Sequence, residues 1–152
     1  MSAAARDVVI DLVHGITPEY DAGDPFECIA PADGAGADLE SYASRRRAFD
    51  LITLSWPVDG GIATATAPLY RETWGVRVSY PAPLPNDRER LVRAIASDQR
   101  AIWRALLSPT GWTAVLDNLH VGVDPPTIEA VSGIDGEIVA YHSTIPFTVE
   151  YY

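Results

Sequence analysis

The chain has 152 residues and a mass of 16.5 kDa, which is the size of a single domain. It carries 21 acidic and 11 basic residues, and the resulting net charge of −10 opposes binding of a phosphate backbone over a broad face. All the basic residues are arginine, so lysine-dependent chemistry, such as a Schiff base or a Walker-type phosphate site, is excluded. The sequence therefore predicts one globular domain, residues 1–152, that does not bind nucleic acid sequence-specifically.

The cysteine content and the first residues of the chain indicate in which cellular compartment the protein is expected. Cys28 is the only cysteine, which excludes an intrachain disulfide framework and a cysteine-rich zinc site. The longest apolar run near the N-terminus is Val8, Val9 and Ile10, too short for a signal-peptide core or a membrane span. We therefore expect a soluble protein that is not exported and has no membrane partner.

The first third of the chain is predicted to hold one helix and a long irregular segment. Residues 2–14 place Val8, Val9, Leu12 and Val13 close to one helical stripe. Residues 17–38 are rich in proline, glycine and acidic residues, a composition typical of turns. We expect residues 17–47 to form an acidic loop insertion, mostly irregular, with room for one short strand near residues 26–29.

Two strands and a long helix are predicted next. Residues 48–56 are rich in β-branched and aromatic residues and are followed by Pro57, and residues 72–81 alternate between apolar and polar side chains. Residues 87–107 then repeat apolar residues at helical spacing. We expect this helix to bury the stripe formed by Leu91, Val92, Ile95, Ala96, Ile102, Trp103 and Leu106.

The C-terminal part is predicted to consist of strands. Residues 113–121 indicate one strand, and residues 127–134 and 137–152 indicate a hairpin with Asp135 and Gly136 in a type I′ turn. Together these elements predict an α+β fold. It has an antiparallel or mixed β-sheet, two helices packed on one face, a C-terminal β-hairpin and a long irregular N-terminal loop.

No catalytic signature is present in the sequence. His14, His120 and His142 stand apart without metal-ligand spacing, and the acidic residues of the loop do not follow the order of a calcium-binding loop. Neither Cys28 nor Ser132 lies in a nucleophile motif. We therefore expect no enzyme activity, no catalytic, cofactor-binding or metal-binding residues and no cofactor. An acid/base site assembled from distant residues is a weaker alternative.

Two groups of arginines are candidates for a subunit interface. Arg93, Arg100 and Arg104 form a basic stripe on the long helix, and Arg45, Arg46 and Arg47 are consecutive. One interpretation is a solvated surface with local ion pairs. The other is a set of arginines that bind acidic loops of a neighbouring subunit.

The last strand is a third candidate for the interface. Pro146 has no N–H to donate, so the strand is expected to lie at an edge, to bulge or to lose pairing on one side there. Phe147, Val149 and Tyr151 continue the alternation after the proline. We expect this strand to present an unpaired edge that the N-terminal segment covers or that another protein extends by strand addition.

The order of these elements resembles the tail terminator proteins of long-tailed bacteriophages. The resemblance covers residues 70–152 and the first helix, and it is one of element order and terminal-strand character without an invariant motif. It is carried by the segments TWGVRVSYPAPLP, NDRERLVRAIASDQRAIWRALLSP, TGWTAVLDN and STIPFTVEYY.

The resemblance implies a structural virion protein located in the tail or neck and assembled in the host cytoplasm. Such a protein forms a homohexameric ring that caps the tail tube and joins tail to head, with the tail tube protein and head–tail connector or neck proteins as partners. The alternatives are a monomeric or dimeric α+β domain that binds a small molecule or a peptide and, less favoured, an enzyme.

Overall fold

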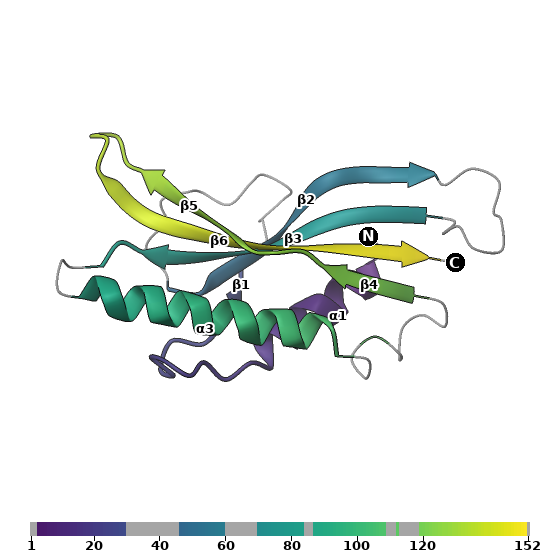
Figure 1. Cartoon of the computed structure of the whole chain (residues 1–152), viewed down its shortest axis with the longest axis horizontal. Helices are drawn as coiled ribbons and strands as arrows, with labels where there is room; N and C mark the ends of the chain where they lie inside the picture. The colour runs from purple at the N-terminus through teal and green to yellow at the C-terminus, as the bar shows by residue number, and fades with distance from the viewer. Residues whose placement is uncertain are drawn as a thin grey trace.

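The computed structural model shows an α+β fold in which two helices lie on one face of a sheet (Figure 1). It describes residues 3–29, 46–59, 70–83, 87–108, 112 and 119–151. The predicted fold class is therefore confirmed. In chain order the elements are α1 (Ala3–His14), β1 (Glu27–Cys28), β2 (Ala48–Asp59), β3 (Tyr70–Pro81), α3 (Arg88–Leu106), β4 (Leu119–Val123), β5 (Thr127–Ser132) and β6 (Ile138–Tyr151).

The strand order is β1-β2-β3-β6-β4, and β5 also pairs with β6. Only the β1–β2 pair is parallel, so the described sheet is mixed. Strand β3 accompanies β6 from the pair of Tyr70 with Tyr151 to the pair of Pro81 with Ala140. On its other side, β6 pairs first with β5 and then with β4. β6 is therefore an inner strand, with partners on both sides.

This pairing corrects the expectation of an unpaired edge along the last strand. Strand β4 covers the segment beyond the proline, with Val123 opposite Phe147 and Leu119 opposite Tyr151. The predicted loss of pairing at Pro146 is confirmed locally. Pro146 accepts a hydrogen bond from the Asp124 N–H through its carbonyl oxygen (2.9 Å) but returns none. The position where Pro146 lacks an N–H faces the residues between the end of β4 and the start of β5.

Strand β2 continues past the position where it was expected to stop. Pro57 was predicted to end the strand, but pairing with β3 extends to Asp59. The register shifts between Thr53 and Ser55 and again between Ser55 and Val58. Proline is tolerated in such an irregular stretch because no regular ladder donor is needed there.

The core lies between the helices and the sheet face that they cover. Strand β6 turns its odd-numbered residues toward the helices, and β3 turns its even-numbered ones. Most of the buried side chains are apolar. The buried polar side chains among the described residues are Arg47, Glu72, Ser79, Asp98, His142 and Ser143. The largest apolar side chains of the core are Val9, Val13, Phe49, Val76, Tyr80, Ile102, Leu106, Ile145 and Phe147.

Helix α3 buries a narrower stripe than the sequence predicted. Leu106 is buried as expected, whereas Trp103 is 44% exposed and Val92 is 61% exposed, so their predicted burial is wrong. Successive helical residues are turned by about 100°, and the buried stripe follows Leu91, Ile95, Asp98, Ile102 and Leu106. Trp103 and Val92 therefore lie on the flank of the helix.

The turn of the β5–β6 hairpin also differs from the predicted type. The N–H of Gly136 donates to the carbonyl of Gly133 (3.1 Å), and the N–H of Gly133 donates to Glu137 (2.8 Å). Only Gly136 has a positive φ, 76°, whereas a type I′ turn needs two such residues. The connection is a turn with Ile134 and Asp135 at its centre, followed by a left-handed glycine.

We expect the substitution Leu106→Ala to lower the free energy of unfolding by about 2–5 kcal/mol, because it empties a fully buried site. The matched control is Trp103→Ala on the exposed flank of the same helix, for which we expect a clearly smaller loss. Urea denaturation monitored by circular dichroism measures both. Equal losses for the two variants would contradict the assignment of the buried stripe.

Candidate interaction surfaces

Arg47 is the largest fully buried side chain of the described residues. It precedes β2 and has a left-handed φ of 60°. Its Nε donates to the Asp98 carboxylate on α3 (2.7 Å). Its two terminal nitrogens donate to the backbone carbonyls of Tyr20 (2.6 Å), Asp21 (2.9 Å) and Asp24 (2.9 Å). Four of the five guanidinium N–H groups are thus used inside the protein.

A tyrosine completes this buried cluster. The Tyr80 hydroxyl on β3 donates to the same Asp98 oxygen (2.8 Å). Burial and the adjacent carboxylate raise the pKa of Tyr80 well above its ordinary value, so it remains a donor. Burial also raises the pKa of Asp98, although Arg47 and the Tyr80 hydrogen bond act to lower it. The guanidinium carbon of Arg47 lies 5.7 Å from the centre of the buried Phe26 ring.

The arginine triplet therefore does not form one surface. Arg47 is in the interior, so its predicted place in a subunit interface is wrong. Arg46 is half-buried and pairs with Asp21 (2.7 Å). Arg45 lies outside the described residues. The sequence misses Arg47 because three consecutive arginines are usually solvated, and its partner Asp98 is 51 residues away.

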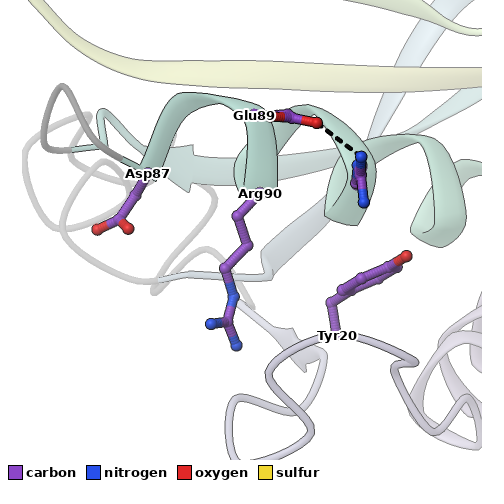
Figure 2. Close-up of a pocket in the computed structure, with 5 residues that line it drawn as sticks. Tyr20, Asp87, Glu89 and Arg90 are labelled. Atoms are coloured by element: carbon purple, nitrogen blue, oxygen red, sulfur yellow. Dashed lines mark hydrogen bonds and ion pairs between the residues drawn. The ribbon is translucent and has the colours of Figure 1, made fainter.

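The Arg47 cluster joins the segment around Tyr20 to the middle of α3, and this segment also lies beside the start of the helix. There the two elements enclose an open pocket of about 670 Å³, lined by Tyr20, Asp87, Glu89, Arg90 and Arg93 (Figure 2). Arg93 donates to Glu89 (2.6 Å), an exposed pair one helical turn apart. Arg90 pairs outside this set, with Asp21. The pocket is thus charged with both signs.

The other two arginines of the helical stripe have no carboxylate partner among the described residues. Arg100 makes one long hydrogen bond to the Ala96 carbonyl (3.4 Å), and Arg104 is exposed. The predicted stripe is therefore divided. Arg93 belongs to a local ion pair, whereas Arg100 and Arg104 present open positive charge.

Arg100 borders a shallow groove between α3 and the edge of the sheet, which we call the helix groove. It has a volume of about 340 Å³, and the exposed indole of Trp103 forms part of its wall. Most of its lining is apolar. The residues that line it are Ala96, Gln99, Arg100, Trp103, Pro126 and Ile145.

The β5–β6 hairpin exposes a second apolar surface. Figure 1 shows the hairpin running past the neighbouring strands and bending away from the helices. At its tip, Ile134 is 98% exposed, and Ile138 and Val139 are 47% and 40% exposed. We call residues 133–139 the hairpin tip.

The terminal-strand candidates lie elsewhere. Phe147 and Val149 are fully buried against the helices, so their predicted exposure to another subunit is wrong. The alternation that identified them marks the helix-facing side of an inner strand. The backbone of Tyr151 pairs with Tyr70 and Leu119, and its side chain lies outside the described part of the chain.

The sheet face away from the helices is polar. Arg77 forms two hydrogen bonds with Asp50 across β2 and β3 (3.1 and 2.8 Å). Arg71 pairs with Glu150 (2.9 Å) across β3 and β6. On the same face His142 is buried, and burial together with nearby Arg77 lowers its pKa. Cross-strand ion pairs thus occupy part of this side of the sheet.

The histidines and acidic residues do not form a metal site in the described part of the chain, where no group of three candidate ligands comes together. The Nε2 of His14 accepts a hydrogen bond from the Cys28 N–H (3.1 Å), which joins α1 to β1. The side chain of His120 lies outside the described residues. Among the described residues, the helices lack the combination of length and apolar composition that a membrane span requires.

Comparison with known proteins does not assign the chain to a family. No protein-family model matches the chain, and no curated protein matches it.

We expect Arg47→Met to lower the free energy of unfolding by about 3–5 kcal/mol, because it leaves the buried Asp98 carboxylate without its cation. The control, Arg93→Met, breaks an exposed pair and should change it by less than about 0.5 kcal/mol. Urea denaturation measures both. A loss below about 1 kcal/mol for Arg47→Met would show that the cluster does not hold the fold together.

We expect protein stability to fall with decreasing pH partly through His142. Its folded-state pKa is lowered, so the unfolded chain binds the proton more readily. The stabilisation is complete above the unfolded pKa of about 6.5 and is lost as pH falls toward the folded value. The urea midpoint should therefore drop less between about pH 7.5 and 5.5 in His142→Gln than in the parent. Parallel curves would contradict this.

Proposed function

We propose that the chain is a non-enzymatic structural protein of a long-tailed bacteriophage virion, a tail terminator or a closely related neck protein. In this role six copies form a ring that caps the tail tube. One side of the ring binds the tail tube protein, and the other binds the head–tail connector or neck proteins. The protein assembles in the host cytoplasm and becomes part of the tail or neck.

The placement of exposed apolar side chains carries this proposal. Eight large apolar side chains of the described residues are exposed. Seven of them lie on two features, the β5–β6 hairpin and helix α3 with the residue after it. Apolar side chains gathered in this way are typical of protein contact surfaces. Two different surfaces on one chain allow the head-to-tail association from which a closed ring is built.

The fold and the charge support the same role. The α+β fold with its helices on one face is the fold that the resemblance to tail terminators implies. The net charge of −10 keeps single copies soluble before assembly. It also disfavours retention of DNA, which must pass the ring on its way through the tail.

The proposal is tested on the purified full-length chain. Light scattering should give a species of six times the 16.5 kDa subunit mass, alone or after addition of tail tubes. Negative-stain electron microscopy should show rings, and on tubes these rings should occupy one end. A protein that stays monomeric in both conditions and leaves tube ends bare would overturn the proposal.

A small-molecule-binding domain is the second candidate, because the pocket beside Tyr20 has the volume of a ligand site. It combines the aromatic ring of Tyr20 with carboxylates and guanidinium groups, which suits a ring compound that carries charges of both signs. A monomer whose thermal midpoint rises with such a compound, and does not in Arg90→Gln, would favour this candidate over the ring.

A further inference from the structure

The hairpin tip and the helix groove have complementary chemistry. The tip presents three exposed apolar side chains, with Ile134 the most exposed large apolar residue of the described chain. The groove has a largely apolar lining in which Trp103 is exposed. An aliphatic side chain entering a pocket walled by an aromatic ring is a common centre of a protein–protein interface.

The charges around the two surfaces are opposite. The tip contains Asp135 and Glu137, and residues 124–140 contain no basic residue. Arg100 lines the groove, and Arg104 lies one turn further along α3. Neither arginine has a carboxylate partner among the described residues. An acidic apolar tip is therefore matched to a basic apolar groove.

A hairpin tip does not reach the groove of its own chain. Ile134 follows Pro126, which lines the groove, by eight residues of a strand and its turn. At about 3.3 Å per residue this separates the two by roughly 25 Å. The hairpin also bends away from α3 (Figure 1). The occupant of the groove must therefore come from another molecule.

We propose that the hairpin tip of one copy docks into the helix groove of the next copy. Ile134 packs against Trp103, and Asp135 and Glu137 face Arg100 and Arg104. The contact joins two different surfaces, so a pair of copies keeps one free groove and one free tip, on different copies, for further copies. This proposal rests on the ring proposed above and names the surfaces through which its neighbours bind.

The test uses two variants, each defective in one half of the contact. Ile134→Asp places a charge at the tip, and Arg100→Glu reverses the charge of the groove. Each alone should raise the dissociation constant between copies by about 30-fold or more and leave monomers. Leu54→Asp is the matched control, because Leu54 is 45% exposed on β2, away from both surfaces, and it should assemble like the parent. Circular dichroism establishes that all three variants are folded.

Mixing the two defective variants provides the sharpest result. The Ile134→Asp variant keeps an intact groove and the Arg100→Glu variant an intact tip, so the mixture should form one-to-one dimers and stop there. A second rescue is Glu137→Arg combined with Arg100→Glu in one chain, which should restore assembly that either change alone weakens. Assembly should also weaken as salt is raised.

The outcomes separate this contact from the ring itself. If the parent forms rings that neither variant disrupts, the tip–groove contact is wrong and the ring stands. If the parent forms open chains that both variants disrupt, the contact stands and the closed ring is wrong. A parent that stays monomeric at every attainable concentration, with and without tail tubes, overturns both.

Discussion

The fold depends on one buried cation, the Arg47 guanidinium. It lies where the irregular N-terminal segment, the sheet and helix α3 meet, and it has hydrogen-bond partners in the first and the last of these. A guanidinium out of water is tolerated only when its partners are all in place, because desolvation costs several kcal/mol per ion. The path of the chain from Tyr20 to Asp24 follows from this constraint, since three of its carbonyls face the guanidinium. An acidic, turn-rich segment with little to bury is thereby fixed against the core.

Elements governed by local periodicity could be predicted from the sequence. The long alternation after Ile138 predicted one continuous strand, and the apolar repeat from Leu91 predicted helix α3. The alternation of apolar and polar residues does not show whether a strand pairs with other strands on one side or on both. The same pattern fits an edge or an inner strand, and only the pairing of β4 decided between them. The hairpin turn was misjudged because an Asp-Gly pair is compatible with more than one turn, and here only Gly136 adopts positive φ.

The candidate surfaces were less predictable, because they depend on contacts between distant residues. Three consecutive arginines look alike in sequence, yet one is internal and one pairs at the surface. A signal was present in Asp98, a carboxylate in the middle of the apolar stripe between Ile95 and Ile102, which indicates a buried partner. A second signal was Trp103, which is too far around the helix to join that stripe. Apolar residues in excess of one stripe indicate a second contact surface.

The consecutive prolines between β4 and β5 limit the pairing of another strand with this border of the sheet. Pro125 and Pro126 lie between the two strands that form this border of the sheet, so two consecutive amide donors are missing there. Another strand paired along this border would lose its backbone hydrogen bonds midway. The registers of β4 and β5 against β6 also differ by one residue, so a single straight strand could not pair regularly with both. Edge-to-edge pairing with another sheet is therefore opposed at this border. A second molecule that binds at this border must therefore be recognised through the shape and charge of side chains and not through backbone pairing.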